Sequence, residues 1–410
     1  MQSESESESK NATRSTDPMP VNRLSPMGFV LAFGVVSGLS DLVYEGARSV
    51  TGPLLASFGA GAALVGLITG AGEAVALVLR LPFGMLSDRT GRPWPITVAG
   101  YAITMVAVPL LAVVGALWPA AALVVLERFG KAVRTPARDT MLAQASTDMG
   151  RGRAFAIHEA LDQSGALIGP LVLAAAIAVI GGLRWGFAVL AVPAVAALVV
   201  LGRVRTAVPR PDAYEHGDGD HASEDRSSAR LPVRFWLYAG FAALNMFGFA
   251  TWGVLAFHLQ TRGVVPTSVI PVMYALAMGL AAVGALASGW VYDRVGLRGL
   301  AIVPVLTAVV PFLSFSLSAG VAWAGAAVWG LALGIHESTM RAAVADLVPA
   351  RRRGTGYGAF TGIYGVAWLV GGTLIGAAYA RSVGTAEAVV VGTQAVALVA
   401  FVPLVLRGSS

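Results

Sequence analysis

Several ionisable side chains lie inside long apolar segments, at spacings that place them on shared helical faces. Asp41, Glu45 and Arg48 follow one another at intervals of four and three residues, and His158 and Asp162 are four residues apart. A charge in hydrocarbon costs at least about 2.5 kcal/mol, so a functional role is the default expectation for such groups. At a carboxylate in this setting, a proton and a cationic molecule compete for one place, which is the chemistry that antiport requires.

Basic side chains accompany these acids. Residues 127–138 carry a mostly basic stripe at helical spacing, and we expect its bases to hold the acids ionised or to bind an anionic part of a substrate. The predicted proton-carrying residues are Asp41, Glu45, Glu73 and Asp162. The predicted lining of a substrate cavity adds Arg48, Arg128, Lys131, Arg134, His158, His336, Glu337, Trp252, Tyr274 and Tyr364. Alternatively, the charges only lock helices together, as a pair of Arg134 with Asp139 would, and the aromatic residues only pack or face lipid.

The elements that must position these charges are membrane-spanning helices. Hydrophobic residues make up 56% of the chain and charged residues 13%, with a mean hydropathy of +0.70, whereas about a quarter of the residues in soluble proteins are charged. Apolar runs of roughly 20 residues are long enough to cross a bilayer. They predict an all-α membrane protein with twelve spans, at about 27–48, 61–83, 95–117, 119–145, 154–180, 184–203, 233–258, 264–288, 299–319, 321–347, 356–380 and 386–406.

The spans fall into two predicted bundles of six helices, residues 23–204 and 232–410. Residues 1–22, with their Ser-Glu repeat, are predicted to be a disordered tail, and the polar residues 205–231 a flexible linker. Arginine and lysine concentrate in the loops on one side, and such loops remain cytoplasmic. The sequence therefore predicts a multi-pass protein of the inner (plasma) membrane with both termini and the linker in the cytoplasm.

Composition and motifs also exclude several classes of function. The formal charge of +6 fits this topology better than nucleic-acid binding, because the arginines lie in short loops. Cysteine is absent, which excludes disulfides and thiolate metal sites. The sequence has no P-loop lysine motif, zinc-protease helix motif or nucleophile elbow, which argues against an enzyme. We expect no cofactor, no bound metal and no nucleic acid; the expected partners are a small-molecule substrate, protons and the lipid bilayer, with the protein as a monomer.

Two loops repeat nearly the same residues. The stretch from Gly84 to Pro93 reads GMLSDRTGRP, and the stretch from Gly289 to Arg298, 205 residues later, reads GWVYDRVGLR. A second pair of similar segments begins at residues 151 and 353. This pattern predicts a parallel duplication, and parallel repeats place a binding site between the halves near the bilayer midplane.

The first loop resembles the signature between helices two and three of the major facilitator superfamily, and the second resembles its degenerate copy. The resemblance implies a latch in which Asp88 faces the start of the helix near Gly354 while Arg92 pairs with Asp139. Gly84 is expected to let two helices approach closely. The alternative is a solvated loop whose charges only fix topology. The implied latch residues are Gly84, Asp88, Arg89, Gly91, Arg92, Asp139, Asp293 and Arg294.

Gly165, Gly169 and Pro170 form a G-x-x-x-G-P element similar to one in the exporter branches of that superfamily, although Leu173 and Ala174 stand where that pattern has glycines. A helix-packing motif with a proline kink is the alternative. An acid in the first span facing a base in the fourth resembles the drug/proton antiporters. The leading hypothesis is a proton-coupled exporter of small organic molecules; the alternatives are an exporter of metal ions or anionic metal chelates, and a membrane sensor that moves no ligand.

Overall fold

The computed structural model describes residues 22–146, 150–214, 231–349 and 352–406, and within these ranges every regular element is a helix. Helices suit this composition because an α-helix satisfies its own backbone hydrogen bonds where no water is available. The predicted tail, except for residue 22, and residues 215–230 of the predicted linker lie outside the described residues.

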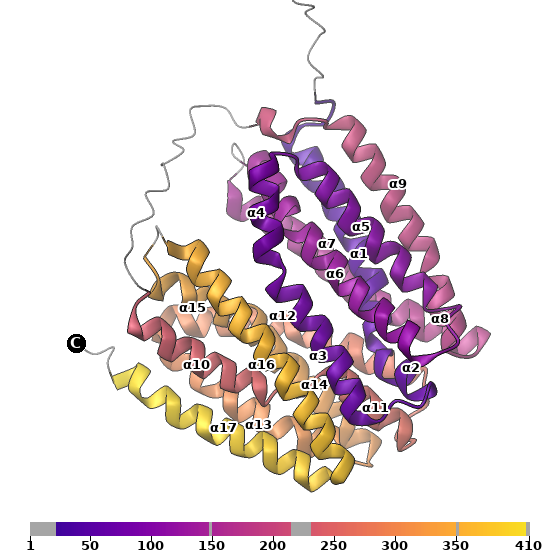
Figure 1. Cartoon of the computed structure of the whole chain (residues 1–410), viewed down its shortest axis with the longest axis vertical. Helices are drawn as coiled ribbons and strands as arrows, with labels where there is room; N and C mark the ends of the chain where they lie inside the picture. The colour runs from indigo at the N-terminus through magenta and orange to yellow at the C-terminus, as the bar shows by residue number, and fades with distance from the viewer. Residues whose placement is uncertain (1–21, 147–149, 215–230, 350–351, 407–410) are drawn as a thin grey trace, which may run out of the picture.

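The first half of the chain, residues 22–214, occupies the upper right of Figure 1. Its helices are α1 (Pro26–Ser49), α2 (Thr51–Ser57), α3 (Ala62–Val78), α4 (Arg80–Thr90), α5 (Pro93–Leu110), α6 (Leu117–Ala145), α7 (Arg151–Ile180), α8 (Leu183–Val189), α9 (Ala191–Ala207) and the short 3₁₀ helix η1 (Pro211–Tyr214).

The second half, residues 231–406, lies at the lower left of the same view (Figure 1). It comprises α10 (Val233–Phe247), α11 (Trp252–Thr261), α12 (Val269–Val295), the 3₁₀ helix η2 (Gly296–Ala301), α13 (Ile302–Ser314), α14 (Ala319–Glu337), α15 (Thr339–Leu347), α16 (Arg353–Arg381) and α17 (Val383–Leu406).

Ten helical segments in the described residues are long and apolar enough to cross a membrane. One of them, Val269–Ser314, is 46 residues long and contains both α12 and α13. The 29-residue helix α6 is not among the ten, and it carries the basic stripe predicted from the sequence. The structure is therefore an all-helical membrane protein.

Small residues bring α1 and α7 into backbone contact within the first half. A methyl group added at Gly165 would strike the backbone of Gly38, and one at Gly169 would strike Leu42. The G-x-x-x-G-P element therefore packs α7 directly against α1, as glycine pairs do in membrane helices. This packing fixes the relative positions of the ionisable residues that the two helices carry.

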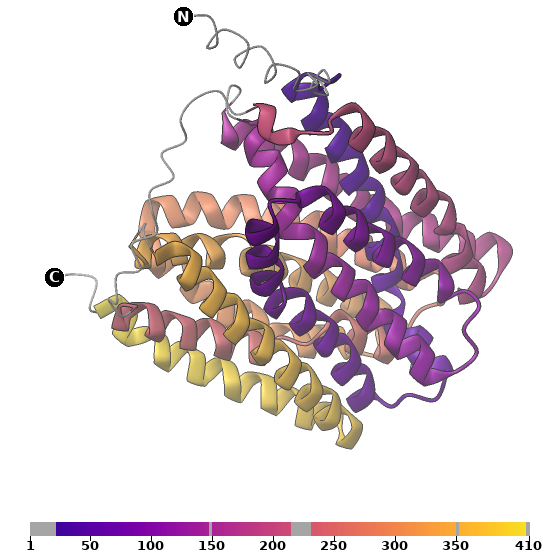
Figure 2. The same cartoon turned by 45° about the horizontal axis from the view of Figure 1, so that its top comes forward.

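The two halves contact each other along α3 and α16, which lie side by side in both views (Figures 1 and 2). A side chain at Gly66 would meet the backbone of Gly372, so a larger residue there would force these helices apart. Gly52 of α2 meets the backbone of Gly253 of α11 in the same way.

Hydrogen bonds reinforce this contact beside α2 and α11. The indole Nε1 of Trp252 donates to the carbonyl oxygen of Ser49 over 2.9 Å. The hydroxyls of Thr69 and Thr251 are 2.9 Å apart. We call this region, where α2 meets α11, the closed end of the molecule.

Candidate functional site

A cavity of about 250 Å³ lies between the two halves and is lined by residues of both. Its lining extends from Arg48 and Trp368 in the interior to Asp139 and Glu159 near the surface. We call it the central cavity. It contains all four predicted proton-carrying residues and most of the predicted substrate residues: Asp41, Glu45, Glu73, Asp162, Arg48, Arg128, Lys131, Arg134, His158, His336, Glu337 and Tyr364.

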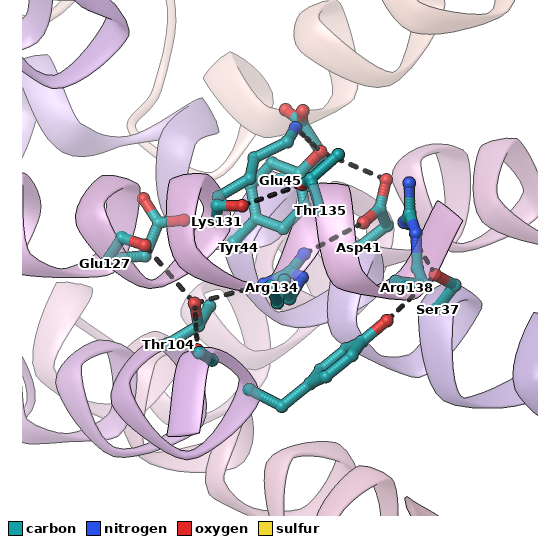
Figure 3. A network of polar contacts seen from close by, with 12 residues as sticks. Ser37, Asp41, Tyr44, Glu45, Thr104, Glu127, Lys131, Arg134, Thr135 and Arg138 are labelled. Atoms are coloured by element: carbon teal, nitrogen blue, oxygen red, sulfur yellow. Dashed lines mark hydrogen bonds and ion pairs between the residues drawn. The ribbon is translucent and has the colours of Figure 1, made fainter. Parts of the chain in front are cut away.

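Tyr44 connects the acids of α1 to the bases of α6. Its hydroxyl donates to Asp41 Oδ2 over 3.0 Å and accepts a hydrogen bond from Lys131 Nζ (Figure 3). The Lys131 ammonium also lies 4.1 Å from the centre of the Tyr44 ring, within the range of a cation–π interaction. Tyr44 was not among the predicted site residues, although its position three residues after Asp41 places it on the same helical face.

Arg134 is a deeply buried base of the site, with 1% of its surface exposed. Its guanidinium is 3.8 Å from Asp41, donates to Thr104 Oγ1 over 3.0 Å and lies over the ring of Tyr101 (Figure 3). The suggested pairing of Arg134 with Asp139 was wrong, because Asp139 instead pairs with the neighbouring Arg138 at 2.9 Å. Arg134 therefore belongs to the interior of the site and not to its surface.

A chain of ion pairs joins α1, α3 and α6 next to Tyr44. Arg48 is 3.4 Å from Glu45 and 2.8 Å from Glu73. Arg128 is 3.4 Å from Glu73 and 3.2 Å from Glu127. Glu45 and Glu73 thus each have an arginine partner. Removing one member of a buried ion pair strongly destabilises a protein, because the other charge is left without a partner. These ion pairs therefore hold the three helices together.

The ion-pair chain also reaches the second half of the molecule. The hydroxyl of Tyr274 in α12 donates to Glu45 Oε2, and the Arg48 guanidinium lies 6.0 Å from the centre of the Trp368 ring. Tyr274 was predicted as a cavity residue; it is fully buried and contacts the site through this hydrogen bond.

Asp162 and His158 lie on α7 and line the central cavity. The Oδ1 atom of Asp162 and the Nε2 atom of His158 are buried and have no hydrogen-bond partner among the described residues. Within the same part of the chain, no ion pair joins Asp162 to a base or Lys131 to an acid. Asp162 and Lys131 thus lack the ion-pair partners that the acids and arginines of the ion-pair chain have.

The second half contributes mainly aromatic groups to the central cavity. His336 is buried, and neither of its ring nitrogens has a hydrogen-bond partner among the described residues. Its ring packs 5.0 Å from Phe249 and 6.0 Å from Tyr364. Glu337, Phe360 and Trp368 also line this wall.

A second cavity, of about 30 Å³, lies between the ion-pair chain and the closed end. It is lined by Arg48, Glu73 and Arg128 on one side and by Thr251 and Trp252 on the other. We call it the small cavity. Trp252 was predicted to line the substrate cavity; it lines the small cavity and is absent from the lining of the central one.

The repeated loops lie outside the central cavity. Gly91 ends α4 in a left-handed conformation with φ of 58°, which favours glycine, and Asp88, Arg89 and Arg92 are exposed. Gly84 does not make the expected close approach, because an added methyl group would meet only Pro136 at an ordinary 3.6 Å.

In the second loop, Asp293 and Arg294 are exposed, and Arg294 lies over the ring of Trp290. The implied pair of Arg92 with Asp139 is not among the ion pairs of the described residues, where Asp139 pairs with Arg138. Within these residues there is also no group of three or more His, Asp or Glu side chains placed to hold a metal ion.

A polar cavity between two bundles of membrane helices is the arrangement of a secondary transporter. Residues 33–372 match the family model of the Major Facilitator Superfamily, and the chain belongs to this superfamily of membrane transporters. It is thus a transporter and not an enzyme.

The chain is also similar to uncharacterized proteins of other organisms. The chain is 50% identical over 380 residues to an uncharacterized protein of Mycobacterium tuberculosis, covering 92% of each chain. It is 31% identical over 141 residues to an uncharacterized MFS-type transporter of Methanocaldococcus jannaschii, covering 34% of this chain and 35% of the other.

Among solved structures, a bacterial homologue of the human lysosomal transporter Spinster, inward-facing and unoccupied, aligns with a TM-score of 0.70 at 16% identity, covering 92% of this chain and 95% of that one. The nucleoside transporter NupG aligns with a TM-score of 0.71 at 12% identity, covering 92% of this chain and 98% of that one. At these identities the likeness concerns the fold.

Proposed function

We propose that the protein exports small organic molecules in exchange for protons, by alternating access of the central cavity to the two sides of the membrane. One observation carries this proposal: in the interior of the cavity, the carboxylates of Asp41 and Asp162 lack a close arginine partner within the described residues. Asp41 has only Arg134 at 3.8 Å, and Asp162 has no ion pair there. A carboxylate held loosely in this way can exchange a proton, whereas Glu45 and Glu73 are held by arginines.

The proposal includes twelve spans in two bundles related by a parallel repeat. Two additions to the ten apolar segments support this count. The segment Val269–Ser314 contains two helices separated by η2, and α6 is 29 residues long, which is enough to cross the bilayer. The charged residues of α6 make it too polar to count among the apolar segments. We infer that α6 nevertheless crosses the membrane, because Arg128, Lys131, Arg134 and Arg138 line the central cavity.

We further propose that both termini and the linker are cytoplasmic in an inner membrane, on the basis of the arginine-rich loops. In this topology the central cavity, whose lining reaches Asp139 and Glu159 near the start of α7, faces the cytoplasm. The closed end then seals the opposite side. The exposed positions of Asp88 and Arg92 fit a conformation in which the latch of the repeated loop is released.

Transport into inside-out membrane vesicles tests the proposal. The probes are ethidium, tryptophan, tryptamine and indole-3-propionate, each measured with an imposed proton gradient and after its collapse with an ionophore. We expect at least one probe to accumulate only with the gradient. Accumulation that is unchanged when the gradient collapses, or that no probe shows, contradicts proton-coupled export.

Two variants connect the test to the site. Asp41→Asn should abolish gradient-driven accumulation while the protein retains its elution profile in detergent, because Arg134 keeps its contacts with Thr104 and the Tyr101 ring. Asp212→Asn, at an exposed position of η1, is the matched control and should transport normally. Full accumulation by Asp41→Asn would remove this carboxylate from the mechanism.

The alternatives have less support. Export of a metal ion needs a set of ligands, and the described residues contain no group of three suitable side chains. An anionic chelate remains compatible with the basic stripe, and the panel can be extended with ferric citrate to test it. A sensor would bind a probe without moving it, which the vesicle measurement separates from transport. We also propose that the protein acts as a monomer, independently of nucleic acid.

A further inference from the structure

Lys131 is a base of the central cavity that forms no ion pair with an acid in the described part of the chain. Arg48, Arg128, Arg134 and Arg138 each form an ion pair with a carboxylate. Lys131 instead donates to the Tyr44 hydroxyl and lies against the Tyr44 ring. A tyrosine side chain is a weak substitute for a carboxylate, because it carries no formal charge. The ammonium therefore keeps the capacity to bind an anion that enters the cavity.

Asp162 is the corresponding acid. It lines the same cavity, forms no ion pair among the described residues, and has one buried oxygen without a hydrogen-bond partner there. Arg138, a base of the same wall, is already engaged by Asp139 at 2.9 Å and by Ser37 at 3.1 Å. A buried polar atom without a hydrogen-bond partner is destabilising, and a ligand that supplies the partner removes this cost.

The two groups belong to one wall of the cavity. Lys131 reaches Asp41 through the Tyr44 hydroxyl, and Asp41 and Asp162 line the same cavity. The packing of Gly165 against Gly38 holds α7 beside α1 and so fixes this arrangement. One small molecule in the cavity can therefore face both groups.

We propose that the transported molecule is a zwitterion, with an amine that binds Asp162, an acid group that binds Lys131, and an apolar, preferably aromatic, body that packs against Phe360, Tyr364 and Trp368. A cation alone leaves Lys131 without a counter-ion, and an anion alone leaves Asp162 without one. The inference rests on the proposed function, since it names the substrate class of the same cavity.

Proton exchange at Asp162 follows from this assignment and accompanies the exchange proposed for Asp41. The ammonium of the substrate and a proton compete for Asp162, so binding of the zwitterion releases the proton from this carboxylate. Because the zwitterion has no net charge, each exchange for one proton moves one positive charge across the membrane.

Equilibrium binding to the purified full-length protein in detergent tests the substrate class. The ligands are tryptophan, tryptamine and indole-3-propionate, which share a ring and differ in their charged groups; phenylalanine, 2-phenylethylamine and 3-phenylpropionate form a second series. We expect the zwitterion of at least one series to bind about tenfold or more tightly than its matched amine and acid. If neither zwitterion binds more tightly than its matched compounds, the proposal is overturned.

Two substitutions make the assignment of each charge specific. Lys131→Gln should weaken binding of the zwitterion and the acid about tenfold and leave the amine unchanged, whereas Lys131→Arg should retain the preference. Asp162→Asn should weaken binding of the zwitterion and the amine and leave the acid unchanged. Equal losses for all three ligands would indicate general damage to the cavity and contradict the assignment. Arg262→Gln, exposed after α11, is the control.

The two proposals can fail separately. Binding in detergent requires no gradient, so the ranking of ligands does not depend on proton coupling. If vesicle transport ignores the proton gradient while the zwitterion still binds best, the proposed antiport is wrong and the substrate class stands. If transport depends on the gradient but the amine alone is moved, the substrate class is wrong and the antiport stands.

Discussion

The two walls of the central cavity differ in their chemistry. The first half supplies acids and bases from α1, α3, α6 and α7, joined by ion pairs and by the Tyr44 hydroxyl. The second half supplies mostly aromatic side chains, with His336 and Glu337 as its ionisable members in the lining. A common helical scaffold therefore carries two kinds of surface, one suited to charge and the other to an apolar body.

The two halves are therefore expected to differ in how much a substitution destabilises them. Ion pairs in a membrane interior are costly unless every member is paired, so the first half tolerates few changes. Aromatic packing is more forgiving, because ring contacts are each worth about 0.5–1.5 kcal/mol. The substitutions below test this contrast.

The largest effect is expected from Arg134→Met in the first half. The change removes the fully buried base that pairs with Asp41 and donates to Thr104, and leaves the Asp41 carboxylate with the Tyr44 hydroxyl as its hydrogen-bond donor. Breaking a buried ion pair costs about 3–5 kcal/mol, so the temperature of thermal unfolding in detergent should fall sharply. The exposed Arg262→Met is the control. An additional Asp41→Asn change should restore part of the loss; an unfolding temperature equal to that of the unchanged protein would show that the pair contributes little.

A smaller effect is expected where the halves meet. Gly66→Leu places a side chain against the backbone of Gly372, and overpacking costs about 1–3 kcal/mol. This cost disfavours the closed end by about 5- to 150-fold in population. Spin labels at Ser57 and Arg262 should then report longer distances. Gly392→Leu, where an added methyl group meets nothing, should leave the distances unchanged.

Tyr274→Phe tests the hydrogen bond that joins the halves at Glu45. Loss of a hydrogen bond to a charged group costs about 1.5–3 kcal/mol, so transport by vesicles should fall about tenfold. Tyr292→Phe, on the same helix, removes a hydrogen bond to Asp346 and is the matched control. Equal losses in both variants would show that the position between the halves has no special importance.

The smallest effect is expected in the second loop. Arg294→Ala removes an exposed cation–π contact with Trp290 that is worth about 0.5–1 kcal/mol. Transport should remain close to that of the unchanged protein. Asp88→Asn in the first loop should instead shift the distances between the spin labels described above. If the two variants behave alike, the loops do not differ as the halves of the cavity do.

Helical spacing in the sequence was sufficient to find much of the site. It placed Asp41 and Glu45 on one face of α1, and both line the cavity. Partners on different helices could not be found in this way, since the 2.8 Å pair of Arg48 with Glu73 depends on how α1 packs against α3. Spacing along one helix gives no information about such contacts.

Uncharged members of the site were also missed. Tyr44 and Thr104 are uncharged, so placing them in hydrocarbon carries no large free-energy cost, and nothing in the sequence pattern marked them as site residues. Trp252 was predicted to line the substrate cavity, but its place behind the ion pairs depends on the contact of α11 with α2. The membrane class and helical architecture followed directly from hydropathy, because apolar runs of this length leave few other structures.

The small cavity has an electrical consequence. A water molecule needs about 10–15 Å³, so the space of about 30 Å³ behind Arg48, Glu73 and Arg128 can be hydrated. The central cavity reaches Arg48, Glu73 and Arg128 from the other side, so this layer of side chains lies between two spaces that can hold water. Part of the membrane voltage falls across such a thin layer, where a displaced unit charge is worth about 2.3 kcal/mol per 100 mV. A shift of charge within the ion pairs would therefore couple to the membrane voltage.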